Sequence, residues 1–342
     1  MAAIALVVTG CGSSAKSGSQ SSASTGSTPS AAITPPTSTI PTNPPAVAEL
    51  PAAERPRASD FPPAGGRTLV QLAKLVKGTA MLGAADGVFT PGTQRFAFAL
   101  TTKAARYIYA PTAIYVANSP GSRARGPFLA PDDPMGVAPQ YRSEQNSGPG
   151  GLAAIYWSDI PLPRSGVFDV LALTRVGKRL IGSTGEVAVA LSTPIPSPGQ
   201  RPPAIATDTL ASVHGNLALL TTRVPPESMH AVSFNQVLGK RPVALLFSTP
   251  ELCTSRVCGP VTDIMVSLQH AFANRITFIH QEVYVDNDPS KGLRPQLHEF
   301  NLETEPWLFV INRQGIVTAR LQGAFGVVEA RRALESALRG TG

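Results

Sequence analysis

The strongest constraint on the fold is an apolar run that leads into two cysteines in the last third of the chain. Residues Val243–Phe247 are continuously apolar, which predicts a strand buried on both faces of a sheet. The run breaks at Pro250, and Cys253 and Cys258 follow, just before a segment with helical spacing. A thiol at a helix N-terminus ionises more readily than a free one, because the helix dipole stabilises negative charge. The pattern therefore predicts a reactive thiol pair at the start of a helix.

The segments that follow alternate between helical and extended patterns. Helical spacing of apolar residues occurs at 261–273, 293–300 and 327–338. Extended apolar patterns occur at 276–285, 307–311 and 316–321, with a tight turn at 312–315 between the last two. This order is typical of an α/β domain with a central sheet, and we expect the domain to cover residues 225–342.

The C-terminal third resembles the thioredoxin-like superfamily, in particular its membrane-anchored bacterial branch. The paired cysteines follow the first core strand, Glu305-Pro306-Trp307 directly precedes another core strand, and 312–317 is similar to the hairpin that follows in the family. The family carries a cis-proline that faces the thiols. The resemblance implies that Pro306 packs against Cys253, and that Glu305, Pro306 and Trp307 present the main chain that binds the substrate.

The spacing of the cysteines departs from the family, which has two residues between them where this chain has 254–257. Residues five apart in one ideal helix have Cα atoms about 8–9 Å apart, whereas a disulfide needs roughly 4.4–6.8 Å. We therefore expect Cys253 in a loop and Cys258 in the first helical turn. We favour Cys253 as the attacking thiol and Cys258 as the resolving thiol; the reverse assignment stays open because Cys258-Gly259-Pro260 copies the start of the common motif. Arg256 is expected to lower the pKa of a neighbouring thiol.

The N-terminal segment ends in Val8-Thr9-Gly10-Cys11, which resembles the lipobox of bacterial lipoproteins. The resemblance implies that residues 1–11 form the signal segment and that Cys11 becomes lipidated, although no Lys or Arg precedes the apolar run. Residues 12–66 are rich in Ser, Thr, Ala, Gly and Pro and predict a disordered tether, because they cannot bury enough apolar surface to fold. An anchor followed by a tether places the rest at the extracytoplasmic face of the cell membrane, where disulfides persist.

The middle region, residues 67–198, predicts an antiparallel β-sandwich, and 199–224 predicts a linker. Gly and Pro clusters divide five short runs that have strand patterns: 94–100, 112–117, 152–157, 166–173 and 185–191. The segment 165–172 resembles a late strand of immunoglobulin-like bacterial domains. We expect 119–150 to be a long loop, and Asp132-Asp133 within it to be a solvated turn rather than a metal site. The expected fold class is thus a multidomain chain with an immunoglobulin-like sandwich and a thioredoxin-like α/β domain.

These features predict a membrane-anchored thiol–disulfide oxidoreductase that acts through Cys253 and Cys258 on protein thiols or disulfides of the cell envelope, without a cofactor or metal. The net charge of +7 comes from scattered Lys and Arg with no long basic run, so we expect no nucleic-acid partner. Two alternatives stay open. One is a non-catalytic binding or assembly lipoprotein with a structural disulfide. The other is a copper metallochaperone that uses the thiols with His280 or His298.

Overall fold

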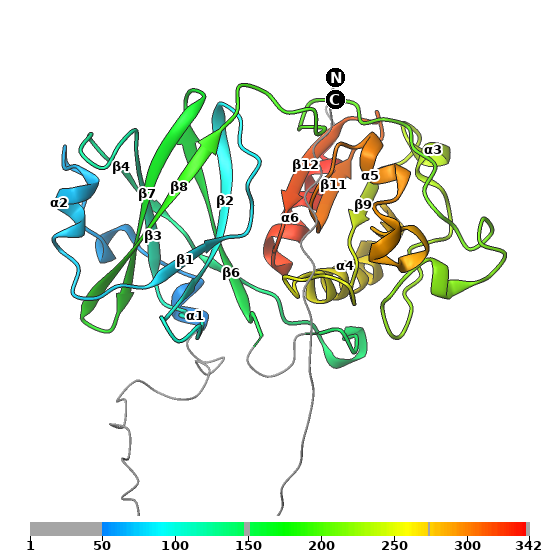
Figure 1. Cartoon of the computed structure of the whole chain (residues 1–342), viewed down its shortest axis with the longest axis horizontal. Coiled ribbons are helices and arrows are strands. Elements are labelled where there is room, and N and C mark those ends of the chain that lie inside the picture. The colour runs from blue at the N-terminus through cyan, green and yellow to red at the C-terminus, as the bar shows by residue number, and fades with distance from the viewer. Residues whose placement is uncertain (1–49, 147–150, 273, 340–342) are drawn as a thin grey trace, which may run out of the picture. The chain divides into compact units, whose positions relative to one another are not determined.

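Three four-stranded sheets organise the described part of the chain. The computed structural model describes residues 50–146, 151–272 and 274–339. In this part of the chain, two sheets are antiparallel throughout and the C-terminal sheet is mixed (Figure 1). The protein is therefore rich in β-structure and is built on more than one sheet, which agrees with the prediction of a multidomain chain that contains several strands.

The first two sheets are formed by residues 81–189. One has the order β1-β2-β6-β5, with strands Met81–Ala84 (β1), Gly92–Thr101 (β2), Asp132–Pro134 (β5) and Ala154–Leu162 (β6). The other has the order β4-β3-β7-β8, with strands Thr112–Ala117 (β3), Arg125–Leu129 (β4), Gly166–Val176 (β7) and Arg179–Val189 (β8). Strands β7 and β8 pair along their full length as a hairpin, in which Gly166 lies opposite Val189 at one end and Val176 lies opposite Arg179 at the other.

One apolar core contains side chains from both of these sheets. Phe98 of β2 stacks on Phe96 and on Tyr156 of β6, each with ring centroids 5.3 Å apart. The same core includes Phe168 and Val170 of β7. These residues lie two apart along their strands because successive side chains of a strand point to opposite faces. The two sheets therefore share a sandwich core.

Ordered structure begins before the sandwich, inside the segment predicted as a tether. Helix α1 (Leu50–Ala53) and a short 3-10 helix, Ala58–Asp60, precede helix α2 (Leu69–Ala73). Leu50, Ala53 and Phe61 are buried, so this end of the segment supplies apolar groups to the core. Cys11 and residues 12–49 lie outside the described residues, so the lipid anchor and the rest of the tether stay predictions.

The C-terminal sheet has the order β10-β9-β11-β12. Its strands are Val243–Phe247 (β9), Thr277–Gln281 (β10), Trp307–Ile311 (β11) and Val317–Gln322 (β12). Strands β9 and β10 are parallel, whereas β11 is antiparallel to both β9 and β12. The helices of this region are Phe234–Val237 (α3), Cys258–Phe272 (α4), Pro295–Glu299 (α5) and Val327–Leu338 (α6). The predicted limits of β9, β11 and α6 match the observed ones.

Helices cover both faces of the C-terminal sheet. Ala244 and Leu246 of β9 share an apolar cluster with residues of α4 and α6. Val243, Leu245 and Phe247 alternate with them and share the opposite cluster with residues of α3 and α5. This alternation is what a strand buried on both faces requires. Short 3-10 helices lie in the connections, at Pro139–Tyr141 (η3), Leu217–Leu219 (η4), Val285–Asn287 (η5) and Pro289–Lys291 (η6).

The predicted loop at 119–150 instead contributes structure that packs on the C-terminal helices. It contains β4, β5 and η3, and its Met135 and Val137 lie in the same apolar cluster as α4 and α6. Asp133 is buried and accepts hydrogen bonds from the backbone N–H groups of Val328 (2.9 Å) and Glu329 (2.6 Å) at the start of α6. The expectation of a solvated acidic turn is therefore wrong, because the orphan donors of a helix N-terminus pair with this carboxylate.

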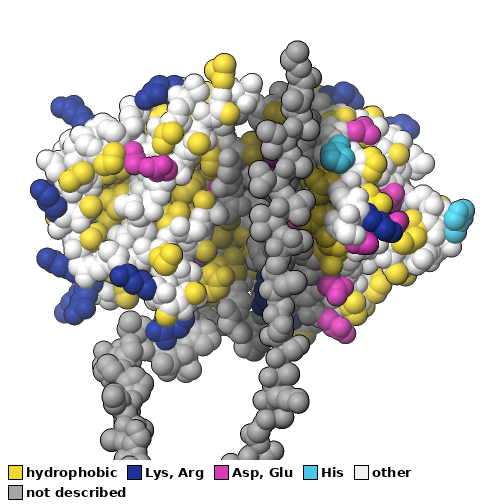
Figure 2. All heavy atoms as spheres, in the orientation of Figure 1, with side chains coloured by type: hydrophobic (Ala, Val, Ile, Leu, Met, Phe, Trp, Pro, Cys, Tyr) yellow, Lys and Arg dark blue, Asp and Glu magenta, His cyan; other side chains and the backbone are white. Residues whose placement is uncertain are grey.

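No helix among the described residues is long and apolar enough to cross a membrane. On the face drawn in Figure 2, Lys and Arg side chains stand in separate places rather than in one continuous basic surface. Their scatter agrees with the sequence, in which basic residues form no long run.

Candidate functional site

The two thiols lie where β9 leads into α4. The backbone N–H of Arg256 donates to the Cys253 carbonyl at 3.1 Å and closes a turn, and the helix begins at Cys258. The turn places one thiol in the loop and the other in the first helical turn, as the spacing predicts. Both thiols are free and buried, with Cys253 6% exposed and Cys258 fully covered. The two Sγ atoms and a carboxylate oxygen of Glu305 all lie within 4.8 Å of one another.

The two thiols have pKa values shifted in opposite directions. A hydrogen bond from the Cys258 thiol lowers the pKa of Cys253 to about 5, with further help from the Ser255 hydroxyl and from nearby backbone N–H groups, and against the effect of burial. The Ser255 Oγ atom lies 3.2 Å from the Cys253 sulfur. Burial, together with the hydrogen bond to Cys253, raises the pKa of Cys258 well above its usual range. Near neutral pH, Cys253 is therefore the thiolate and Cys258 keeps its proton.

Glu305, Pro306 and Trp307 differ in what they offer to the thiols. Glu305 is half-buried, and burial together with the Cys253 thiolate raises the pKa of its carboxyl group. The Glu305–Pro306 bond is cis, as the resemblance implies, and Pro306 is buried. Trp307 is 1% exposed and stacks on Phe309 with ring centroids 5.9 Å apart, so its side chain belongs to the core. Of these three residues, Glu305 brings an ionisable side chain to the sulfurs.

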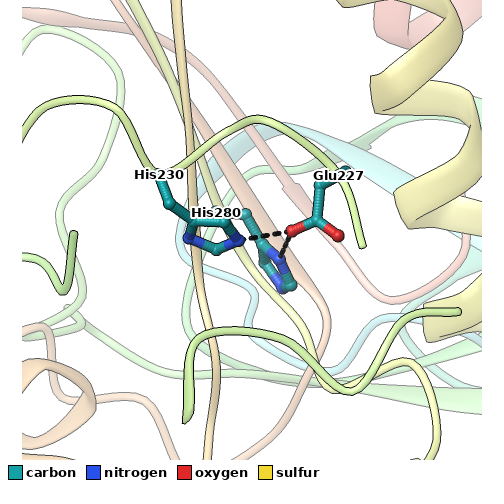
Figure 3. A group of neighbouring side chains, drawn as sticks. All are labelled: Glu227, His230 and His280. Atoms are coloured by element: carbon teal, nitrogen blue, oxygen red, sulfur yellow. Dashed lines mark hydrogen bonds and ion pairs between the residues drawn. The ribbon is translucent and has the colours of Figure 1, made fainter. Parts of the chain in front are cut away.

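A second cluster of ionisable side chains was missed by the sequence analysis. Glu227 Oε1 lies 2.5 Å from His280 Nδ1 and 2.6 Å from His230 Nε2 (Figure 3). All three residues are buried, and both imidazole rings point toward the same carboxylate. The copper alternative pairs the thiols with His280 or His298, but the structure places His280 against Glu227 and His230, and His298 is exposed on α5. A Glu-x-x-His spacing at 227–230 was the available sequence signal.

A chain of hydrogen bonds joins this cluster to the first turn of α4. His280 Nε2 lies 2.9 Å from the Ser248 hydroxyl and 3.0 Å from the Ser248 carbonyl. The Ser248 hydroxyl lies 2.9 Å from Thr262 Oγ1, which donates to the Cys258 carbonyl at 2.8 Å. The histidine cluster is therefore linked to the Cys258 carbonyl through Ser248 and Thr262, although it is separate from the thiols themselves.

A loop from the middle region fixes the position of α4. The buried Asp263 carboxylate accepts from the Ser143 backbone N–H at 2.9 Å and from the Arg223 side chain at 3.0 Å. A Cβ atom on Gly259 would lie 2.3 Å from the Gln145 carbonyl oxygen, so the loop packs directly on the first turn. These contacts hold the helix N-terminus, and with it Cys258, in one place.

No protein-family model matches the chain, and no curated protein matches it. The function is therefore inferred from the geometry of the site.

Proposed function

We propose that the protein is a thiol–disulfide oxidoreductase that acts on protein thiols or disulfides through Cys253 and Cys258. The observation that carries this proposal is the close approach of two free thiols whose pKa values are shifted in opposite directions. Exchange needs a thiolate to attack and a second thiol to resolve the mixed disulfide. The asymmetry assigns the attacking role to Cys253, which is also the less deeply buried of the two.

The reaction follows from these roles. In the reducing direction, the Cys253 thiolate attacks one sulfur of the substrate disulfide, forms a mixed disulfide and releases the other sulfur as a thiolate. Cys258 then loses its proton and attacks the Cys253 sulfur, which forms the Cys253–Cys258 disulfide and releases the second substrate thiolate. Two electrons pass to the substrate, and the oxidising direction is the reverse. A stabilised Cys253 thiolate favours the dithiol form and so makes the disulfide a stronger oxidant.

The Glu305 carboxylate is placed to receive the proton of Cys258. It lies within 4.8 Å of both sulfurs, and its raised pKa makes it a better proton acceptor than an exposed carboxylate. We therefore assign Glu305 a proton-transfer role in addition to the substrate-binding main chain that the family resemblance implies for residues 305–307.

The order of elements in the C-terminal region supports the resemblance to thioredoxin-like proteins. A strand, helix and parallel strand (β9, α4, β10) are followed by an antiparallel hairpin and helix (β11, β12, α6), with the thiols after the first strand. We take the preceding sandwich as an immunoglobulin-like recognition module. The lipobox-like segment at Cys11 supports an extracytoplasmic, membrane-anchored location with substrates in the cell envelope.

A disulfide-reduction assay with the full chain tests the proposal. The reduced protein is mixed with a disulfide-bonded protein such as insulin, and the release of thiols is followed. We expect Cys253→Ser to abolish exchange, whereas Cys258→Ser accumulates a covalent adduct visible on a non-reducing gel. Cys11→Ser is the matched control and keeps full exchange. If wild type and both variants behaved alike, the cysteines would be inert and the chain would be a binding or assembly protein.

A further inference from the structure

Counting protons assigns the direction of each hydrogen bond behind α4. Thr262 Oγ1 gives its one proton to the Cys258 carbonyl at 2.8 Å. The Ser248 hydroxyl must then donate to Thr262 Oγ1 at 2.9 Å, and it has no proton left for His280. His280 Nε2 is therefore the donor in its contacts with the Ser248 hydroxyl at 2.9 Å and the Ser248 carbonyl at 3.0 Å.

This assignment determines what the other nitrogen of His280 must face. In a neutral imidazole with its proton on Nε2, the Nδ1 atom carries only a lone pair. It lies 2.5 Å from Glu227 Oε1, and His230 Nε2 lies 2.6 Å from the same oxygen. A lone pair and a carboxylate oxygen attract each other at such a distance only when a cation lies between them. That cation is either a proton or a metal ion.

We propose that Glu227, His230 and His280 form a binding site for a divalent transition-metal ion, with zinc as the reference case. Two imidazole nitrogens and one carboxylate oxygen are a donor set that zinc accepts. The three ligand atoms lie within 4.8 Å of one another, and Figure 3 shows both rings directed at the carboxylate. Tetrahedral ligands 2.0–2.1 Å from zinc lie about 3.3 Å apart. The two nitrogens must therefore each move away from Glu227 Oε1 by roughly 0.8 Å, a small side-chain adjustment.

The surroundings of His280 and Glu227 match those of metal ligands. A metal-bound histidine usually donates its second N–H to a carboxylate or a backbone carbonyl, which fixes its tautomer. His280 donates to the Ser248 carbonyl in this way. The second oxygen of Glu227 accepts a hydrogen bond from the Thr221 hydroxyl at 2.9 Å, which orients the carboxylate. Because the site uses none of the cysteines, it is independent of the thiol chemistry proposed above.

The test measures zinc bound to the full, untagged chain in which Cys11, Cys253 and Cys258 are all replaced by serine, so that thiols take up no metal. The protein is dialysed against zinc and then against buffer, and its metal content is determined by mass spectrometry. We expect about one zinc per chain, as the single site implies. Glu227→Gln and His230→Gln in the same background should each lower the zinc content at least tenfold. His298→Gln removes an exposed histidine and should retain the zinc.

Two further measurements distinguish a loss of zinc binding from a failure of the variant to fold. Circular dichroism reports the fold of each variant, and Gln at 230 keeps a donor for the Glu227 carboxylate. Zinc should raise the unfolding temperature of the triple-serine protein but not that of its His230→Gln variant, because a ligand stabilises only the state that binds it. A triple-serine protein that takes up no zinc, or folded variants that keep it, would overturn the proposal and leave a proton shared between Glu227 and His280.

Discussion

Arg95 in the sandwich, with a side chain 13% exposed, and Cys253 in the C-terminal region, which is buried, both carry charge away from bulk water, yet their surroundings differ. The Arg95 guanidinium donates to both oxygens of Glu329 at 2.6 and 2.8 Å, to Asp86 at 3.2 Å and to the carbonyls of Gln322 and Ala324. Cys253 is held by a thiol, a hydroxyl and nearby backbone N–H groups, none of which carries a charge. A charged group paired with opposite charges fixes packing, whereas a thiolate that has only uncharged partners stays available for attack.

The largest expected effect is the difference in alkylation rate between the Cys253 and Cys258 thiols. With a pKa of about 5, Cys253 is almost entirely thiolate at pH 7, whereas the raised pKa of Cys258 leaves it protonated. We expect iodoacetamide to modify Cys253 on the order of 100-fold faster than Cys258 at pH 7, since only the thiolate reacts. The rate at Cys253 should reach half its maximum near pH 5. Peptide mapping of the alkylated sites gives both rates, and equal rates would remove the asymmetry on which the exchange mechanism depends.

Breaking the Arg95 cluster should cost stability without changing the thiols. Arg95→Met leaves Glu329 and Asp86 buried without their cation, which typically lowers the free energy of unfolding by about 3–5 kcal/mol. Denaturant titration measures this change. Arg179→Met, which removes an exposed arginine at the start of β8, is the matched control and should shift the free energy by less than about 0.5 kcal/mol. If the folded Arg95 variant also lost the low pKa of Cys253, the thiol pair would depend on the Arg95 cluster, contrary to this expectation.

Replacing Asp132 should change the free energy of unfolding by an intermediate amount, and the change should be a gain rather than a loss. Both of its carboxylate oxygens are buried and have no hydrogen-bond partner among the described residues, and burial raises the pKa of the group to about 7. The unfolded chain loses this proton near pH 4. The folded state therefore binds more protons between about pH 4 and pH 7, and its stability falls as the pH rises through that window. Asp132→Asn should raise the free energy of unfolding at pH 8 by about 1–2 kcal/mol, since the amide still lacks partners.

Chemical denaturation of wild type and Asp132→Asn at pH 5 and pH 8 checks this prediction. The gain should be smaller at pH 5, where the folded wild type keeps its proton. Asp133→Asn is the contrasting variant, because Asp133 pairs with the backbone at the start of α6 and its replacement should destabilise the protein. A loss of stability in both variants would mean that the Asp132 carboxylate has a partner in solution.

Parts of the fold and site could be predicted because their signals are local. The predicted ends of β9, β11 and α6 are correct because continuous apolar runs mark the two strands and helical spacing marks the helix. Helix geometry alone predicts that Cys253 lies in a loop and Cys258 in the first helical turn. The cluster of Glu227, His230 and His280 could not be predicted in this way. Its members are brought together because the segment 227–230 lies against β10, where the His280 backbone N–H donates to the Met229 carbonyl at 2.9 Å, a contact between residues far apart in sequence.

Composition is a poor guide to burial where tertiary contacts override it. Asp132 and Asp133 lie in a segment rich in Gly and Pro, which favours an exposed turn. The structure buries the pair because the same segment packs on α4 and α6. Leu50 and Phe61 likewise fall in the segment that the sequence predicts as a tether, since two apolar residues among many small ones give no periodic signal, yet both are buried. In each case the partner that covers the residue lies in a different part of the sequence.

The smallest effect tests how much the Ser255 hydroxyl contributes to the reactivity of Cys253. Ser255→Ala removes one hydrogen bond to the sulfur and leaves the bond from Cys258 in place. A hydrogen bond to a charged group contributes about 1.5 kcal/mol, so the pKa of Cys253 should rise by at most about 1 unit. The pH profile of alkylation measures the shift, and Thr254→Ala, at the neighbouring exposed position, is the control. A rise of several units would mean that Ser255, and not the Cys258 thiol, is the main cause of the low pKa of Cys253. The activation of one cysteine by the other would then be wrong.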